Sequence, residues 1–248
     1  MSDFYVGYLP KAPPSLGRFV QRIVLLLAVI VLTVAAALIA GQKPFANSFF
    51  EYGNVRPFEG RIEAHPYPTL VVPRPGDVSN EVGTSRYLLV APGKHGADDI
   101  VASLDGKQVR LQGQMIYRDG GVMVEVEPGS IGSTNVVPSP PDRTTDLGAV
   151  TVRGEIVDSK CYLGVMNPGQ GKVHRDCAAR CLSGGIPPIL VTLDRGDQYL
   201  LIGLDRRPLT RNVLREFAAE VITIDGELLT EGNRRLLMID PAMLHHSR

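Results

Sequence analysis

The sequence has few of the features that identify common functional classes. It has no Trp, only 6% aromatic residues and three cysteines, and its 26 Lys and Arg residues equal its 26 Asp and Glu residues in number. A formal net charge of zero leaves no surplus of basic residues for phosphate contacts, so we expect no nucleic-acid partner. Three cysteines are too few for a disulfide-rich scaffold, and an odd number cannot all pair within one chain.

Common catalytic motifs are absent as well. The chain has no G-x-S-x-G nucleophile elbow, no H-E-x-x-H zinc motif and no P-loop. It lacks the C-x-x-C-H motif that attaches a c-type haem. Its N-terminal leader also lacks the twin-arginine pair that would accompany export of a folded iron–sulfur protein. A non-enzymatic function is therefore favoured over an enzymatic one.

One long hydrophobic run lies near the N-terminus. The segment Ile23–Ala40 contains a single polar residue, Thr33. A helix of this length rises roughly 27 Å, which is close to the hydrocarbon thickness of a bilayer. A cleaved signal peptide is the alternative, but its apolar region is normally shorter and follows a shorter leader. The sequence therefore predicts one retained transmembrane helix over residues 23–41.

Basic residues lie mainly before this apolar run. Lys11, Arg18 and Arg22 precede it, and only Lys43 follows closely. Because positively charged flanks stay in the cytoplasm, residues 1–22 are predicted to be a cytoplasmic leader. We expect a single-pass protein of a bacterial inner membrane, with the remainder of the chain in the periplasm.

The remainder of the chain has the pattern of a mainly β protein. Short alternating apolar runs are separated by Gly, Pro and Asp, which indicates strands and turns. Strands are predicted over residues 58–62, 86–90, 108–117 and 122–126 of a first module, and over residues 152–157, 199–202, 221–228 and 236–239 of a second. The modules span residues 54–128 and 149–244, and the Pro-containing segment 129–148 between them is predicted to be a linker.

Matching glycines indicate that the two modules form an internal repeat. Gly60 and Gly154 hold corresponding places in the first strands, and Gly113 and Gly226 do so in the long strands. About five strands in roughly 80–95 residues, with a Gly that can bend the long strand, fit a small OB-type barrel. Chance similarity of short hydrophobic strands is the alternative. We predict two tandem OB-like β-barrels, with a helix over residues 209–217 in the second.

All three cysteines fall in one segment of the second module, residues 158–188. Residues 172–183 have helical composition, and two glycines follow them as a stop signal. His174, Cys177 and Cys181 occupy positions i, i+3 and i+7 of this predicted helix, so they share one face. Cys161, at the end of the preceding strand, could close over that face.

This C-x12-H-x2-C-x3-C pattern offers three thiolates and one imidazole. Such a set suits a tetrahedral zinc ion, and the soft thiolates also favour copper(I). A disulfide from Cys161 to Cys177 or Cys181 is the alternative in an oxidising compartment, with one thiol left free. Inert buried cysteines are a third interpretation. The predicted metal ligands are Cys161, His174, Cys177 and Cys181, and the predicted cofactor is a zinc or copper ion.

The cysteine segment, DSKCYLGVMNPGQGKVHRDCAARCLSGGIPP, resembles a stretch of uncharacterised bacterial proteins that are membrane-anchored or exported. The resemblance covers about thirty residues and implies no substrate or reaction. The likeness of the two modules to OB barrels is at the level of fold, which by itself says little about function.

The sequence contains a membrane anchor and one compact cluster of ligands but no catalytic motif. This combination favours a binding function. We predict an accessory or assembly subunit of a membrane or periplasmic redox complex, with a protein partner in that complex. A thiol-disulfide or copper-transfer protein that uses Cys177 and Cys181 is the first alternative. A purely structural scaffold is the second.

Overall fold

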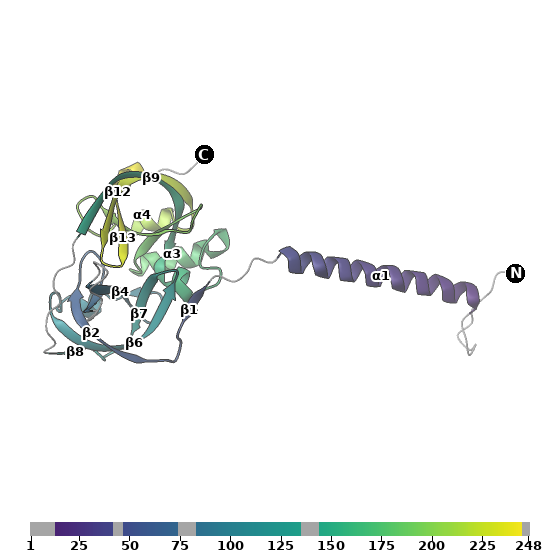
Figure 1. Cartoon of the computed structure of the whole chain (residues 1–248), viewed down its shortest axis with the longest axis horizontal. Coiled ribbons are helices and arrows are strands. Elements are labelled where there is room, and N and C mark those ends of the chain that lie inside the picture. Colours follow the sequence, from purple (N-terminus) through teal and green to yellow (C-terminus); the bar gives the residue numbers. More distant parts are fainter. Residues whose placement is uncertain (1–12, 42–46, 74–82, 135–143, 245–248) are drawn as a thin grey trace. The chain divides into compact units, whose positions relative to one another are not determined.

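The computed structural model describes residues 13–41, 47–73, 83–134 and 144–244. The chain divides into two compact units, residues 1–45 and residues 46–248. The first unit contains helix α1 (Pro14–Gly41), and the second contains two five-stranded barrels (Figure 1). The prediction of a mainly β protein with an N-terminal apolar helix and two small barrels is confirmed.

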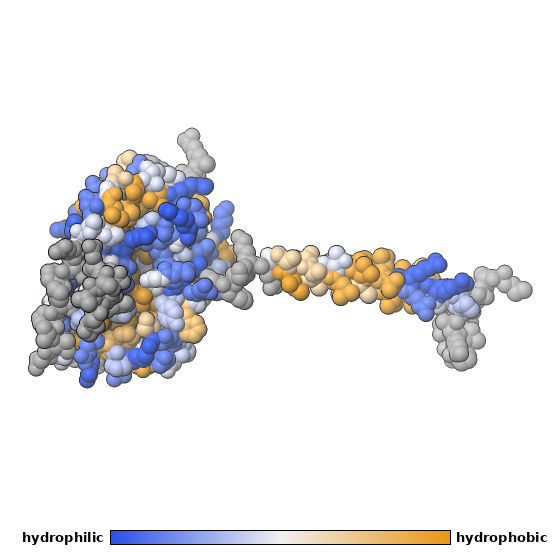
Figure 2. All heavy atoms as spheres, viewed as in Figure 1, coloured by the Kyte–Doolittle hydropathy of each residue, from blue (hydrophilic) through white to orange (hydrophobic). Residues whose placement is uncertain are grey.

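Helix α1 includes the whole of the predicted span and extends into the predicted leader. It begins at Pro14, a residue that fits the first turn of a helix because its missing N–H would have no partner there. Figure 2 shows an apolar surface along α1, with hydrophilic residues gathered toward its N-terminal end. Among the described residues, α1 alone is long and apolar enough to cross a membrane. This pattern is that of a membrane anchor or a signal sequence.

The first barrel closes with strand order β2–β3–β4–β7–β6 and back to β2. Its strands are β2 (Arg56–Glu63), β3 (Thr69–Pro73), β4 (Thr84–Ala91), β6 (Gln108–Arg118) and β7 (Gly121–Val126). All neighbours are antiparallel except β4 and β7. The short helix α2 (Asp98–Val101) precedes β6. Three short strands extend the sheet: β1 (Ser48–Phe50) and β8 (Gly132–Ser133) pair with β6, and β5 (His95–Gly96) pairs with β4.

The second barrel has the same strand order as the first. Its strands are β9 (Thr144–Asp158), β10 (Pro188–Thr192), β11 (Gln198–Gly203), β12 (Val221–Glu231) and β13 (Arg234–Ile239). They close as β10–β11–β13–β12–β9, and the only parallel pair is β11 with β13. Helix α4 (Arg211–Glu216) again lies between the third and fourth strands, and the 3-10 turn η3 (Pro241–Met243) follows β13. Five strands and a helix at this position are features of the OB-type barrel.

Equivalent glycines allow the same close approach in both barrels. A Cβ atom on Gly60 would lie 2.4 Å from the carbonyl oxygen of Val71, and one on Gly154 would lie 2.5 Å from that of Val191. No other residue fits at these distances, so the first strand of each barrel can cross its neighbour only where glycine stands. The glycines that match in sequence therefore have the same packing role.

The sequence pattern misses two barrel strands and the start of a third. The sequence pattern predicts neither β3 nor β10, and β10 begins at Pro188, the last residue of the cysteine segment. Strand β9 begins at Thr144, inside the segment predicted as a linker, and β8 lies in the same segment. The early part of β9 is extended because it pairs with residues of β12 that are distant in sequence. Local composition does not show such long-range pairing.

The two barrels share buried contacts as well as having separate cores. Each barrel encloses its own apolar cluster. A further cluster contains side chains of both, among them Leu88 and Met123 of the first barrel and Val157 and Ile189 of the second. The buried Tyr67 hydroxyl donates a hydrogen bond to the carbonyl oxygen of Leu201 (3.0 Å) across this boundary. Two of the cysteines lie within the shared cluster.

Candidate metal centre

The cysteine segment connects β9 to β10 of the second barrel. It begins with the π-helical turn η1 (Cys161–Val165), passes through the 3-10 turn η2 (Lys172–His174) and continues as helix α3 (Arg175–Ser183). The predicted helix over residues 172–183 is thus present as η2 and α3 together. Cys161 starts η1, and Cys177 and Cys181 lie one turn apart on α3.

The three cysteine sulfurs face one another. Cys161 Sγ is 3.9 Å from Cys177 Sγ and 3.9 Å from Cys181 Sγ, and all three sulfurs lie within 4.8 Å of one another. Metal–sulfur bonds of about 2.3 Å place sulfurs about 3.8 Å apart in a tetrahedron and about 4.0 Å apart in a trigonal plane. In a disulfide the two sulfurs would be only about 2.05 Å apart. The three cysteines are free, and two of the three sulfur pairs are at the spacing of ligands to one ion.

The cluster has a buried side and an open edge. Cys161 and Cys181 are buried, whereas Cys177 is partly exposed. The buried sulfurs lie in the apolar cluster that the two barrels share, which lowers the local dielectric and strengthens electrostatic interactions there. A metal ion or a partner thiol could therefore reach the cluster at Cys177.

His174 belongs to a second donor group that overlaps the first. Its Nε2 lies 3.0 Å from Asp158 Oδ2, and both side chains are buried. The other Asp158 oxygen, Oδ1, accepts a hydrogen bond from the main-chain N–H of Cys161 (2.8 Å). Asp158, Cys161 and His174 offer ligand atoms within 4.8 Å of one another. The structure thus brings the three predicted cysteines together and places His174 beside Cys161.

The pair of Asp158 and His174 has the form of a ligand and its outer partner. Histidines that bind metals commonly donate their other ring N–H to a carboxylate, which sets the tautomer and the ring orientation. In this pair Nε2 contacts the carboxylate, and His174 is grouped with Asp158 and Cys161 rather than with Cys177 and Cys181. The spacing of the motif does not predict this role for Asp158.

A lysine from the first barrel also reaches the cysteines. Lys94 Nζ lies 2.7 Å from Cys177 Sγ and 3.7 Å from Cys181 Sγ. The hydrogen bond to Cys177 raises the pKa of Lys94, which favours its charged form. The hydrogen bond from Cys161 lowers the pKa of Cys181 despite its burial, and the charge of Lys94 adds to this effect. The pKa of Cys161 is raised, chiefly by its hydrogen bond with Cys181 and by burial.

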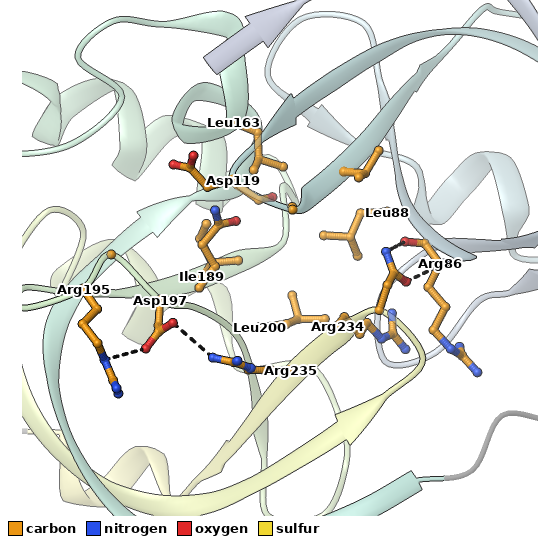
Figure 3. Close-up of a pocket in the computed structure, with 17 residues that line it drawn as sticks. Arg86, Leu88, Asp119, Leu163, Ile189, Arg195, Asp197, Leu200, Arg234 and Arg235 are labelled. Atoms are coloured by element: carbon orange, nitrogen blue, oxygen red, sulfur yellow. Dashed lines mark hydrogen bonds and ion pairs between the residues drawn. The ribbon is translucent and has the colours of Figure 1, made fainter. Parts of the chain in front are cut away.

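A pocket of about 400 Å³ is lined by residues of both barrels, and Ser159 and Leu163 of the cysteine segment are among them (Figure 3). Leu88, Ile189 and Leu200 are among its apolar residues. Asp197 joins two arginines there: its Oδ2 is 3.2 Å from Arg195 Nε, and its Oδ1 is 3.1 Å from a terminal nitrogen of Arg235. None of the three cysteines lines this pocket, so it is not part of the candidate metal centre.

Comparisons with protein-family models, with curated proteins and with solved structures give no match to this chain. Fold and site together define a protein with an N-terminal apolar helix, two small β-barrels and a group of three cysteines that could bind a metal ion. Its function is inferred from the chemistry of those side chains.

Proposed function

We propose that this protein is a membrane-anchored metal-binding protein that holds one zinc or copper ion between Cys161, Cys177 and Cys181. The observation that carries the proposal is the mutual approach of three free thiols, at 3.9 Å for two of the pairs. A copper(I) ion needs only three soft sulfur ligands. A tetrahedral zinc ion needs a fourth ligand, for which His174 is the neighbouring predicted candidate, held by Asp158.

The proposal places α1 in a bacterial inner membrane and the barrels in the periplasm. The basic residues before the apolar run support this orientation. The protein would act there as an accessory or assembly subunit of a redox complex, rather than as an enzyme. The partly exposed Cys177 supports such a role because a partner protein could reach the bound ion from that edge. The common strand order and the equivalent glycines support a duplicated barrel.

Metal content of the full-length protein tests this proposal. The protein is purified in detergent under reducing conditions, incubated anaerobically with zinc or with copper(I), desalted and measured by elemental analysis. We expect about one equivalent of one of these metals in the wild type and a large loss in Cys161→Ser and Cys177→Ser. Ser183→Ala, on the same helix as Cys181, is the matched control and should retain the ion. Less than about a tenth of an equivalent in the wild type would contradict the proposal.

A thiol-disulfide protein is the second candidate, because an ammonium lies beside the partly exposed Cys177. The Cys177 thiolate would attack a disulfide of a partner and form a mixed disulfide, which Cys181 would then break. The Cys177–Cys181 bond forms, and two electrons and two protons reduce the sulfurs of the partner. The test is mass mapping of bridges after incubation with oxidised glutathione. If Cys177 and Cys181 never pair, this candidate is wrong.

A further inference from the structure

The turn that carries Lys94 is held against the cysteine segment by main-chain contacts. This turn joins β4 to β5 of the first barrel. The N–H of Gly96 donates a hydrogen bond to the carbonyl oxygen of Gly184 (2.9 Å), directly after α3. A Cβ atom on Gly184 would lie 1.8 Å from the carbonyl oxygen of Lys94. The glycine that ends α3 is therefore also the place where the turn of the other barrel docks.

Lys160 holds the same turn through its side chain. It directly precedes Cys161 and is only 2% exposed. Its Nζ donates hydrogen bonds to the carbonyl oxygens of Ala91 (2.8 Å) and Gly93 (2.7 Å), and it forms an ion pair with Glu125. A buried ammonium is stable only while it is paired and hydrogen-bonded, so the turn cannot move away without a cost. The segment that supplies the cysteines thus fixes the main chain beside Lys94.

The ammonium of Lys94 supplies positive charge where a metal–thiolate centre needs it. Three thiolates around a zinc ion leave one negative charge in excess, and around copper(I) they leave two. Hydrogen bonds from an ammonium to such sulfurs are charge-assisted and stronger than those to neutral thiols. Lys94 Nζ already contacts Cys177 and Cys181, the two sulfurs of α3. The first barrel, although it has no cysteine, therefore contributes to the site.

We propose that Lys94 is a charge-balancing and positioning residue of the metal centre, and that the ion is bound across the interface of the two barrels. This inference rests on the proposed metal-binding function. When the thiolates bind the ion, the hydrogen bonds from Lys94 strengthen. Metal binding then tightens the contact between the β4–β5 turn and Gly184, and the first barrel is required for full affinity.

The test compares wild type, Lys94→Ala, Lys94→Arg and Lys107→Ala as full-length proteins in detergent. Lys107, an exposed lysine of the same barrel just before β6, is the matched control. Zinc and copper(I) affinities are measured by competition with a chromogenic chelator. Loss of an outer partner of a metal ligand typically weakens binding about 10–100-fold, which we expect for Lys94→Ala. Lys94→Arg should restore part of the affinity because it keeps the charge and donors, and Lys107→Ala should bind as wild type.

Hydrogen exchange of residues 91–97 gives a readout that does not depend on affinity. Metal loading should slow exchange there in wild type and Lys107→Ala, but not in Lys94→Ala. Equal or tighter metal binding by Lys94→Ala would overturn the role of Lys94 and leave the proposed function standing. Unchanged exchange in metal-loaded wild type would overturn the coupling between the ion and the barrel interface. A wild type that binds neither metal would overturn both proposals.

Discussion

At the scale of single residues, Asp158 links two parts of the candidate centre, Cys161 and His174. It is completely buried, and each of its oxygens has a separate partner: Oδ1 accepts from the N–H of Cys161, and Oδ2 lies 3.0 Å from His174 Nε2. A carboxylate in the core is tolerated only with such partners. Asp158 therefore sets both the start of η1, where Cys161 lies, and the orientation of the imidazole.

Replacement of Asp158 by Asn should weaken the centre without removing its volume. The amide oxygen can still accept from Cys161, but the amide nitrogen cannot accept a hydrogen bond from His174. We expect metal affinity to fall about 10–100-fold and the free energy of unfolding to fall by about 1–3 kcal/mol. Chelator competition and denaturant unfolding followed by circular dichroism measure the two effects. Asp176→Asn, an exposed change on α3, is the control, and equal affinity in Asp158→Asn and wild type would contradict the prediction.

Among the elements, helix α3 depends on the glycine that follows it. Gly184 has φ −79° and ψ −1°, a conformation that any residue adopts. Its requirement for glycine comes instead from the neighbouring turn of the first barrel, because a side chain would overlap the Lys94 carbonyl oxygen. The end of α3 is thus specified by packing between barrels rather than by backbone conformation.

The change Gly184→Ala isolates this packing. We expect it to destabilise the barrels by about 1–3 kcal/mol, the usual cost of overpacking, since main-chain atoms must move. It should also speed hydrogen exchange at Gly96, whose N–H is bonded to Gly184. Gly132→Ala on β8, where a Cβ would meet nothing within 4 Å, should change stability by less than about 0.5 kcal/mol. Equal unfolding midpoints for the two variants would show that the close approach is not required.

Helix α1 has a property that can be tested separately from the barrels. Arg at the centre of a membrane helix costs about 2.5–3.5 kcal/mol of insertion free energy, so Leu27→Arg should reduce the fraction that stays with membranes after an alkaline wash. Ser15→Arg places the same charge at the start of α1, near Arg18 and Arg22, and should remain with the membranes. If Leu27→Arg stays in the membrane fraction as wild type does, the predicted effect of this substitution is wrong.

At the scale of the whole molecule, the two barrels act as one unit. They share an apolar cluster, and a buried arginine joins carboxylates from both. Arg86, which is 3% exposed at its side chain, forms an ion pair with Glu63 of the first barrel and lies 3.6 Å from Glu231 of the second. Burial alone would raise the pKa of Glu63, but the hydrogen bonds and charges of Arg86 and Arg61 outweigh it and lower the pKa.

This pair should make stability depend on pH. The pKa of Glu63 is lower in the folded protein than its ordinary value of 4.5. Its contribution to the free energy of unfolding is therefore complete above pH 4.5 and is lost as the pH falls through the folded pKa. Glu63→Gln should therefore lower the free energy of unfolding by about 2 kcal/mol at neutral pH, and by progressively less below about pH 4.5. Denaturant unfolding at several pH values measures the difference. A cost that is constant with pH would contradict this prediction.

Much of the fold could be predicted because its signals are local. Three signals can each be recognised within a short stretch of sequence. They are the apolar run of α1, the alternating pattern of strands such as β4, β6 and β12, and the helical spacing of Cys177 and Cys181. Strands β3 and β10 could not, because they are short and lie next to prolines or loops. Their strand conformation depends on hydrogen bonds to partners that are distant in sequence.

The sequence alone determined the apolar helix and the two barrel modules, and it predicts four candidate metal ligands. These follow from hydrophobic periodicity and from ligand spacing on one helix face. Only the tertiary structure decided that the three sulfurs converge, that Asp158 contacts His174, and that Lys94 reaches the cysteines from the other barrel. The physical reason is that these contacts depend on how the two barrels pack against each other, through a buried lysine and a glycine without a side chain. No local sequence pattern encodes that packing.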